Sequence, residues 1–331
     1  MEVFLELKTS KKVDILKIAD EIIDGRQINR EDDLSVFLDC DLKELTLGAD
    51  RIREHFKGSF VDLCSIVNAK SGNCSQDCKF CAQSSFYNTD CQKYLFLKKD
   101  EILKACGFNK KNNVHRFCIV TAGKALVGED FEKALNTIKI LKKSYDIELC
   151  ASMGFLTKDQ LKELKKAGIT TYHHNIETSK RNFPNISKLH SYDMKIETIK
   201  NVKEVGLRAC SGGIFGLGES VYDRLDMAIS LSEIGVNSIP INILIPVKGT
   251  PFENNEILKE DEILRTIAFF RYINKNAEIR LAGGRNFLKD FGKAAFLSGA
   301  SALIVGNMLT KNVEQSILSD QKMLLKINRK F

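Results

Sequence analysis

From about residue 58 onward, short apolar segments alternate with amphipathic segments of helical periodicity, and this alternation constrains the fold more than any other feature. Strand, helix and strand in steady repetition is typical of parallel βαβ units. Eight strands is the number that closes a (β/α)8 barrel of the TIM type, which is the α/β fold that we predict, although an open doubly wound sheet fits the same pattern. The eight strand candidates are residues 60–68, 115–123, 147–154, 170–178, 207–216, 238–247, 278–284 and 302–306.

The segment before the first strand candidate has a different pattern. Residues 1–57 contain helical periodicity only, which predicts an N-terminal helical extension. No linker rich in proline or glycine interrupts residues 58–331, so we expect one barrel domain that ends in a C-terminal helix. Helices between the strands are predicted at residues 129–143, 157–167 and 194–205.

Composition and charge exclude several classes of protein. Of 331 residues, 44% are hydrophobic and 28% are charged, which is typical of a globular domain. The net charge of +7 is scattered along the chain, so no basic block indicates a nucleic-acid partner. No apolar run is long enough for a membrane span, and no signal peptide is recognisable. Ten cysteines without an export signal favour metal or redox chemistry in a reducing cytoplasm over a disulfide scaffold.

Three of these cysteines are close together in the sequence. Cys74, Cys78 and Cys81 have the spacing C-x3-C-x2-C, and no fourth cysteine follows at the usual interval. A zinc site completed by a remote cysteine is one interpretation, but no second C-x2-C or H-x3-H pair exists. The other interpretation is a [4Fe–4S] cluster with three thiolate ligands and one iron left open for an exogenous ligand, and we favour it.

With Phe80 before its last cysteine, the triplet resembles the signature of the radical S-adenosylmethionine (SAM) superfamily. The resemblance implies that the open iron binds the amino and carboxylate groups of SAM. Cleavage of the bound SAM then gives methionine and a 5′-deoxyadenosyl radical. The triplet follows the first strand candidate, at the end of a barrel where active sites lie.

A glycine-rich segment, residues 211–219, agrees with this interpretation. It resembles the G-x-I-x-G-x-x-E element that contacts the adenine of SAM in this superfamily. A glycine-rich turn after a strand is common by itself and also serves close backbone packing. In combination with the cysteine triplet it implies cofactor contacts for Gly212, Ile214, Gly216 and Glu219.

Three further cysteines lie singly on different strand candidates. Cys118, Cys150 and Cys210 are at similar heights, and the alternation of a strand puts small residues on the same face. A buried free cysteine is ordinary, but three of them predict a common site inside the barrel. Arg280 is predicted to face inward as well, and a buried arginine needs a partner, which a charged inorganic cluster would provide.

These four residues resemble the ligands of the auxiliary iron–sulfur cluster in the biotin synthase family, and the similarity extends from about residue 58 to 310. The resemblance implies a [2Fe–2S] cluster that donates sulfur to dethiobiotin. One radical removes hydrogen from C9, and a second SAM allows attack at C6, which closes the ring of biotin. It also implies flavodoxin or ferredoxin as the electron donor, and we expect a homodimer.

The resemblance extends to residues around the cofactor and the substrate. It implies that Asn175 contacts both, and that Glu177 accepts hydrogen bonds from the ribose hydroxyls. His173 lies on the same strand face, either near the substrate or as a core histidine. Lys195 pairs with the methionyl carboxylate or is a solvated helix lysine.

Three residues are expected to contact dethiobiotin at other points. Asn242 matches the asparagine that contacts the ureido ring, and an amide suits a urea because it both donates and accepts hydrogen bonds. Thr310 and Lys311 match a pair of residues that holds the valerate tail.

Cys64 departs from the family pattern. It is in phase with Ile66 on the first strand candidate, so its side chain is predicted to face inward. A fourth inward thiolate favours a cluster larger than [2Fe–2S], with Arg280 displaced from direct ligation. A buried free cysteine is the alternative.

Two other functions fit part of the pattern. Another radical enzyme with the same barrel, such as a hydrogenase-maturation or methylornithine-forming protein, lacks the full set of strand cysteines with Arg280. An iron–sulfur electron carrier or a structural metalloprotein has no need for a large barrel with a glycine-rich nucleotide element.

Overall fold

The computed structural model describes residues 14–306 and 317–331. Its centre is a closed parallel sheet with the strand order β5-β4-β3-β2-β1-β9-β8-β7-β6, in which β5 also pairs with β7. The strands are β1 Asp62–Lys70, β2 Arg116–Thr121, β3 Glu148–Ser152, β4 Ile169–His173, β5 Arg208–Cys210, β6 Gly213–Phe215, β7 Ser238–Ile243, β8 Glu278–Leu281 and β9 Ala302–Ile304.

Strands β5 and β6 share one position of the barrel, because both pair with β7. The single strand predicted over residues 207–216 is therefore interrupted, at residues 211–212. Gly212 is required there, since a Cβ atom would lie 2.0 Å from the carbonyl oxygen of Pro240. Eight strand positions closed by parallel pairing confirm the predicted (β/α)8 barrel and exclude the open sheet.

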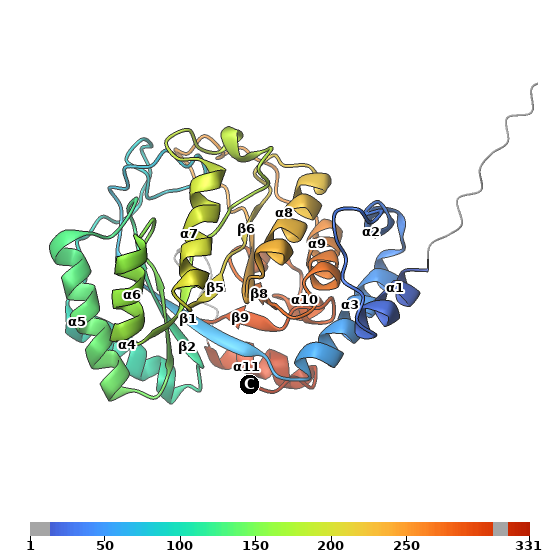
Figure 1. The fold of residues 1–331 in the computed structure, drawn as a ribbon, viewed down its shortest axis with the longest axis horizontal. Helices are drawn as coiled ribbons and strands as arrows, with labels where there is room; N and C mark the ends of the chain where they lie inside the picture. Colours follow the sequence, from blue (N-terminus) through green and yellow to red (C-terminus); the bar gives the residue numbers. More distant parts are fainter. Residues whose placement is uncertain (1–13, 307–316) are drawn as a thin grey trace, which may run out of the picture.

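Helices cover the outside of the barrel (Figure 1). The helices predicted at residues 129–143, 157–167 and 194–205 are α5, α6 and α7. Helix α7 begins earlier than predicted because Ser191 caps it and accepts a hydrogen bond of 3.2 Å from the backbone N–H of Met194. The helices around the barrel are α4 Lys99–Lys111, α5 Gly128–Ser144, α6 Lys158–Ala167, α7 Tyr192–Glu204, α8 Val221–Ile234, α9 Glu260–Ile273, α10 Lys293–Phe296 and α11 Ile317–Lys326.

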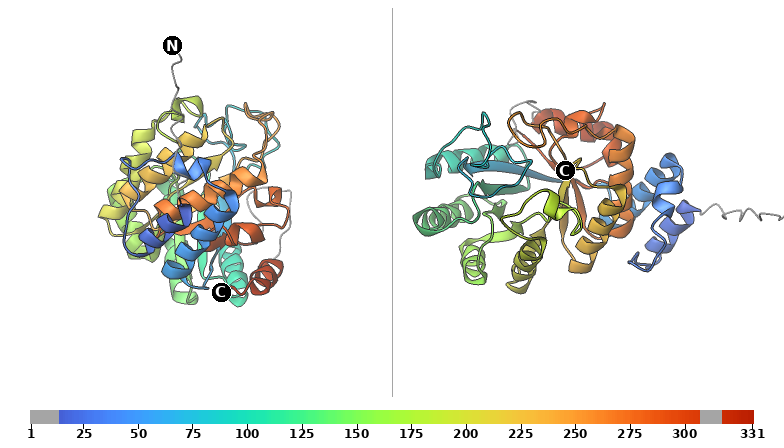
Figure 2. Two further views of the ribbon diagram at one scale, coloured as in Figure 1. Left: turned by 90° about the vertical axis from the view of Figure 1, so that its right-hand side faces the viewer. Right: turned by 90° about the horizontal axis from the view of Figure 1, so that it is seen from above.

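Within the described residues from 14 onward, three helices precede the barrel and lie on one side of it, next to α9 (Figure 2). They are α1 Ile15–Ile23, α2 Val36–Asp39 and α3 Leu42–Lys57, and α3 packs against both α1 and α9. The chain ends beside the start of β1, where the N–H of Val61 donates a hydrogen bond of 2.7 Å to the carbonyl of Lys330. In the described ranges, no helix is both long and apolar enough to cross a membrane.

Strand alternation separates the hydrophobic core from the barrel interior. On β1, Leu63 is fully buried in the large apolar core, whereas Cys64 and Ile66 line a cavity inside the barrel. On β2, Phe117 faces outward and Cys118 inward in the same way. The outward side chains fix the helices to the sheet, which leaves the inward side chains free for chemistry.

Candidate active site

A cavity of about 370 Å³ runs along the inside of the barrel. Charged residues at the beginnings of the strands line its floor, and strand cysteines lie one step further along. Amide side chains follow, and the loop after β1 contributes Phe80 and Cys81. The lining therefore changes from ionic to thiol to amide along the strand direction.

Four cysteine side chains lie together above the floor. Cys64, Cys118 and Cys150 form a buried group separate from the main core, and Cys210 lines the same cavity. Cys118 and Cys150 are direct neighbours in the register of β2 and β3. The sequence had predicted a shared inward position for these thiols, and the cavity brings all four together.

The pKa values of the four thiols respond to burial and to one another. A hydrogen bond to Cys150, together with burial, raises the pKa of Cys64, and that hydrogen bond lowers the pKa of Cys150. Burial raises the pKa of Cys118 and raises that of Cys210 to about 11. Most of the thiols are therefore protonated without a metal, and metal binding here releases protons.

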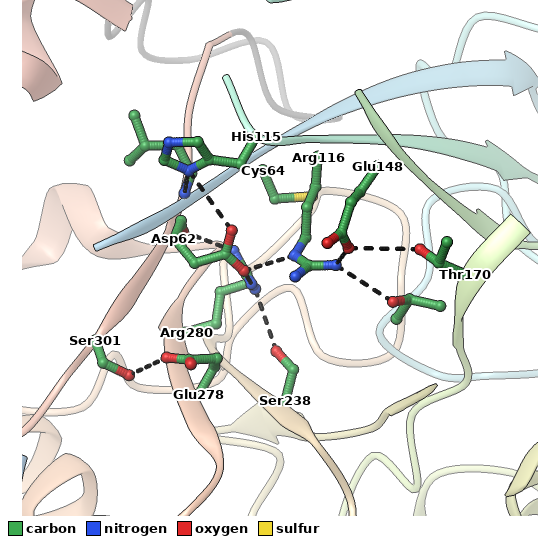
Figure 3. Close-up of polar contacts among 12 residues, drawn as sticks. Asp62, Cys64, His115, Arg116, Glu148, Thr170, Ser238, Glu278, Arg280 and Ser301 are labelled. Atoms are coloured by element: carbon green, nitrogen blue, oxygen red, sulfur yellow. Dashed lines mark hydrogen bonds and ion pairs between the residues drawn. The ribbon is translucent and has the colours of Figure 1, made fainter. Parts of the chain in front are cut away.

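The floor below the thiols is an ionic network centred on Asp62 (Figure 3). Its Oδ2 atom accepts hydrogen bonds of 2.6 Å from Arg280 Nη2 and 2.7 Å from Arg116 Nε. Burial opposes ionisation, but the charges of these arginines and a hydrogen bond from His115 hold the pKa of the Asp62 carboxyl well below its usual range. Sequence reasoning had expected a cluster as the partner of Arg280, and it missed this carboxylate.

The cysteine triplet lies in the loop that follows β1. The N–H of Cys81 donates a hydrogen bond of 3.0 Å to the carbonyl of Cys78, and that of Cys74 donates one of 2.9 Å to the carbonyl of Gln83. Burial raises the pKa of Cys78 to about 12 and that of Cys81 to about 11, and the neighbouring cysteines and Glu177 act in the same direction. The three thiols thus share one site beside Glu177.

A second loop holds the triplet in place. The carboxylate of Asp77 accepts hydrogen bonds from the Ser187 hydroxyl, 2.6 Å, and from the N–H of Lys188, 2.9 Å. His190 Nδ1 lies 2.9 Å from Oε1 of Gln76. Both Gln76 and Asp77 are between ligand candidates, so this loop fixes the backbone that carries the thiols. No local sequence pattern signals these contacts across more than 100 residues.

Four polar side chains form a chain of contacts above the thiols. His173 Nε2 lies 2.9 Å from Oδ1 of Asn175, whose Nδ2 donates a hydrogen bond of 3.2 Å to Glu177. Glu177 Oε1 in turn lies 3.6 Å from Nζ of the buried Lys195. The solvated-lysine interpretation of Lys195 is therefore wrong. Glu177 has φ of 71°, and such backbone strain is typical of functional positions.

The glycine-rich segment is folded around its own glutamate. Glu219 accepts hydrogen bonds of 2.9 Å from the N–H of Gly216 and 2.7 Å from that of Leu217, and Arg224 Nε donates one of 2.8 Å. Its carboxylate is therefore used to shape the turn. Ile214 lines the cavity directly.

Asn242, in β7, lines the same cavity. Its Nδ2 donates a hydrogen bond of 3.0 Å to the carbonyl of Gly213, and its Oδ1 accepts one of 3.0 Å from the N–H of Gly283. One N–H and one lone pair remain for a ligand. Thr310 and Lys311 lie outside the described residues.

Sequence comparisons identify the family. Residues 69–231 match the Radical SAM superfamily, and residues 240–330 match the Biotin and Thiamin Synthesis associated domain. A biotin synthase from Clostridium beijerinckii is 55% identical over 308 residues, which are 93% of this chain and 97% of that relative. This chain belongs to the biotin synthase family. A biotin synthase from Alkaliphilus metalliredigens is 50% identical over 312 residues, 94% of this chain and 98% of the relative.

Solved structures with lower sequence identity share the fold of this biotin synthase family member. A methylornithine synthase has a TM-score of 0.81 at 18% identity, covering 95% of this chain and 96% of its own. A maturase of the [FeFe]-hydrogenase also has a TM-score of 0.81 at 18% identity, covering 96% of this chain and 75% of its own. At this identity the likeness shows the barrel alone, so it gives no support to either rival activity.

Membership in the biotin synthase family, with its radical SAM domain, implies a [4Fe–4S] cluster and SAM. The donor sets fit iron–sulfur clusters: three thiols on one loop, and four around a buried cationic floor. Among the residues that the structure describes, no three His, Cys, Asp or Glu side chains are arranged for a single metal ion. A polynuclear cluster suits wider spacing, because its thiolates bind different iron atoms.

Proposed function

We propose that this enzyme converts dethiobiotin to biotin by inserting a sulfur atom from an auxiliary iron–sulfur cluster between C9 and C6. The observation that carries the proposal is the order of side chains along one cavity. Along the strand direction, Cys118 and Cys150 are third residues of their strands, Asn242 is the fifth residue of β7, Asn175 follows β4, and Cys81 lies in the loop after β1; all of them line the cavity. In this proposal the sulfur source, the urea site and the radical source follow one another in that order.

The cofactor site uses the loop and the turn described above. Cys74, Cys78 and Cys81 would hold the [4Fe–4S] cluster with one iron open. When bound, the cluster and SAM supply the 5′-deoxyadenosyl radical that removes hydrogen from the substrate. Glu177 would accept hydrogen bonds from the ribose hydroxyls, and Lys195 would pair with the methionyl carboxylate. Phe80 and the backbone around Gly212, Ile214 and Gly216 would contact the adenine, and Glu219 holds the turn of this segment in shape.

The two asparagines recognise opposite groups of the ureido ring. Oδ1 of Asn175 already accepts hydrogen bonds from the N–H of Gly212, 3.0 Å, and faces His173. Its remaining N–H therefore donates to the ureido carbonyl. Asn242 has a free lone pair as well and accepts from a ureido N–H. Thr310 and Lys311 hold the valerate tail in this proposal.

Apolar side chains exclude water from the reacting carbons. Ile66, Val120, Ile243 and Leu244 line the cavity together with the amides. Because these apolar side chains exclude water, they protect a carbon radical of the substrate from side reactions before it meets the sulfur source.

The auxiliary cluster is a substrate in this proposal, because its sulfide is consumed. Four thiols, from Cys64, Cys118, Cys150 and Cys210, surround its site. We infer that all four bind iron, which favours a cluster larger than [2Fe–2S].

Cys64→Ala should then lower the amount of iron bound in addition to the [4Fe–4S] cluster. Cys40→Ala, which changes a cysteine in the helical extension, should leave this amount unchanged. Equal iron in wild type and Cys64→Ala would refute the fourth ligand.

The wider context of the reaction follows from the family resemblance. In this proposal the chain divides into an N-terminal extension, residues 1–57, whose described part is helical, and the barrel domain, residues 58–331. The electron donor is flavodoxin or ferredoxin, the enzyme acts in the cytoplasm, where ten free cysteines remain reduced, and it forms a homodimer.

An anaerobic assay tests the function. Reconstituted enzyme with dethiobiotin, SAM and a reductant should form biotin together with methionine and 5′-deoxyadenosine. Cys118→Ala should form 5′-deoxyadenosine but at least 100-fold less biotin (roughly the loss on removing a reacting group). Cys106→Ala, which changes a buried cysteine of α4 away from the cavity, is the matched control and should retain activity. If wild type forms 5′-deoxyadenosine but no biotin, dethiobiotin is not the substrate.

A further inference from the structure

Asp62 is the one buried carboxylate that lines the floor of the thiol cavity in the described part of the chain. It is the first residue of β1, two residues before Cys64 and therefore on the same inward face. Two arginines from different strands, Arg280 of β8 and Arg116 of β2, donate to its single Oδ2 atom. Figure 3 shows the contacts of the Asp62 carboxylate with both guanidinium groups.

The hydrogen bonds of Arg280 are almost all taken by the protein. Its Nε donates to the Ser238 hydroxyl at 3.3 Å, and its Nη1 donates to the carbonyls of Asp62, 3.0 Å, and Leu303, 3.2 Å. Nη2 donates to the carboxylate of Asp62 at 2.6 Å. A guanidinium has five N–H groups and no lone pair, so one N–H is left to face the thiols.

Direct ligation of iron would require a different arrangement. Arg280 would have to lose the unused proton of Nη2, because a protonated guanidinium has no lone pair for iron. The neutral side chain would then leave the buried Asp62 carboxylate with less counter-charge, although Nη2 lies only 2.6 Å from it, and this costs free energy. The observed contacts hold the side chain as a cationic donor.

The charges of the floor do not cancel in the interior. Arg116 and Arg280 share Asp62, and the second carboxylate that contacts Arg116 belongs to Glu148, whose side chain is 47% exposed. Solvent screens Glu148, so one positive charge remains next to the thiols. Such a floor suits an anionic group held by thiolates.

We propose that Asp62 is a positioning residue: it fixes Arg280 and Arg116 as a cationic floor that donates a hydrogen bond and charge to the auxiliary cluster without binding its iron. This inference rests on the proposed function, since it concerns the cluster that donates sulfur. Arg280 then affects the auxiliary cluster through its positive charge and one hydrogen bond.

Pulsed EPR of the wild-type enzyme tests the ligation directly. The enzyme is produced with ¹⁵N-arginine, reconstituted anaerobically and reduced by one electron at the auxiliary cluster. We expect only the weak ¹⁵N coupling of a hydrogen-bonded nitrogen. A strong coupling from a directly bound nitrogen would overturn the inference while leaving the proposed function intact.

A charge-only variant tests Asp62 itself. Asp62→Asn keeps the size of the side chain and removes its charge, so the reduction potential of the auxiliary cluster should shift to a more positive value at unchanged iron content. Asp62→Glu keeps the negative charge, so its reduction potential should lie close to that of wild type. Glu148→Gln is the matched control, because it removes an exposed carboxylate from the same Arg116, and its potential should equal that of wild type.

The outcomes separate the two proposals. Equal potentials in Asp62→Asn and Glu148→Gln would overturn the role of Asp62 alone. Reconstituted wild type that binds only one [4Fe–4S] cluster would overturn the proposed function and this inference with it. Should Asp62→Asn not fold, the ¹⁵N measurement on wild type decides by itself.

Discussion

The side chain of His173 determines which atoms of Asn175 face the cavity. Its two ring nitrogens lie 3.1 Å from the Ser152 hydroxyl and 2.9 Å from Oδ1 of Asn175. Burial, with the charges of Lys195 and Arg280, lowers the pKa of His173 to about 4. A neutral ring then donates through Nε2 and accepts through Nδ1, which orients the amide.

The lowered pKa of His173 predicts a loss of stability in acid. Because the pKa in the folded protein is about 4 and that of an exposed histidine is about 6.5, the contribution to stability is complete above pH 6.5 and is lost as the pH falls toward 4. Between pH 7.5 and 5, wild type should lose about 2 kcal/mol more free energy of unfolding than His173→Asn. Anaerobic urea unfolding at the two pH values measures this difference.

A surface histidine supplies the comparison for this experiment. His55 is exposed near the end of α3, and His55→Asn should keep the wild-type response to pH. If His173→Asn loses as much stability as wild type between the two pH values, the ring is not a buried neutral group.

At the scale of elements, the loop of residues 74–81 depends on the loop of residues 187–190. The Asp77 carboxylate accepts hydrogen bonds from the Ser187 hydroxyl and from backbone N–H groups of that second loop. These hydrogen bonds are charge-assisted. The three thiols therefore keep their mutual arrangement through a segment distant in the sequence.

Removal of the Asp77 charge should weaken the [4Fe–4S] site. Asp77→Asn replaces charge-assisted hydrogen bonds by weaker ones, and the loss of about 1–2 kcal/mol corresponds to a 5- to 30-fold faster loss of cluster iron to a chelator. Asp90→Asn is the control, since Asp90 is an exposed aspartate of the same connecting segment. Equal rates of iron loss, followed by absorbance, would show that the second loop does not hold the cluster site.

The sequence predicted elements better than the contacts between them. Alternation located all eight strand positions, because apolar outward faces and helical segments leave strong periodic signals. The same alternation predicts inward side chains for Asp62 and Arg116, because they are in phase with Cys64 and Cys118. Neither residue was among the predicted site residues. A charged residue on an inward strand face needs a partner inside the barrel.

Other features of the site had no local signal. The contact between Asp77 and Ser187 joins two loops 110 residues apart, and only the fold brings them together. The interruption at Gly212 follows from the close approach of Pro240 on another strand. Contacts of this kind depend on the three-dimensional packing of the barrel, so no single segment of the sequence predicts them.

At the scale of the whole molecule, the end of the chain is fixed to the barrel by a buried ion pair. Arg285 follows β8, and its two Nη atoms lie 2.7 and 2.8 Å from the carboxylate oxygens of Asp320 in α11. The side chains are 3% and 0% exposed. Lys330 then pairs with the backbone before β1, so α11 connects the last strands to the first.

Asp320 should therefore contribute more to stability than an exposed partner of the same type. Asp320→Asn leaves Arg285 buried without its counter-charge, and the free energy of unfolding should fall by about 3–5 kcal/mol. Asp193→Asn breaks the pair with Lys180, whose side chains are 67% and 69% exposed, and should cost less than about 1 kcal/mol. The double change Arg285→Met with Asp320→Leu should recover part of the loss, because no charge is then left unpaired. Anaerobic urea unfolding distinguishes these cases, and equal losses for Asp320→Asn and Asp193→Asn would mean that the buried ion pair does not fix α11 to the barrel.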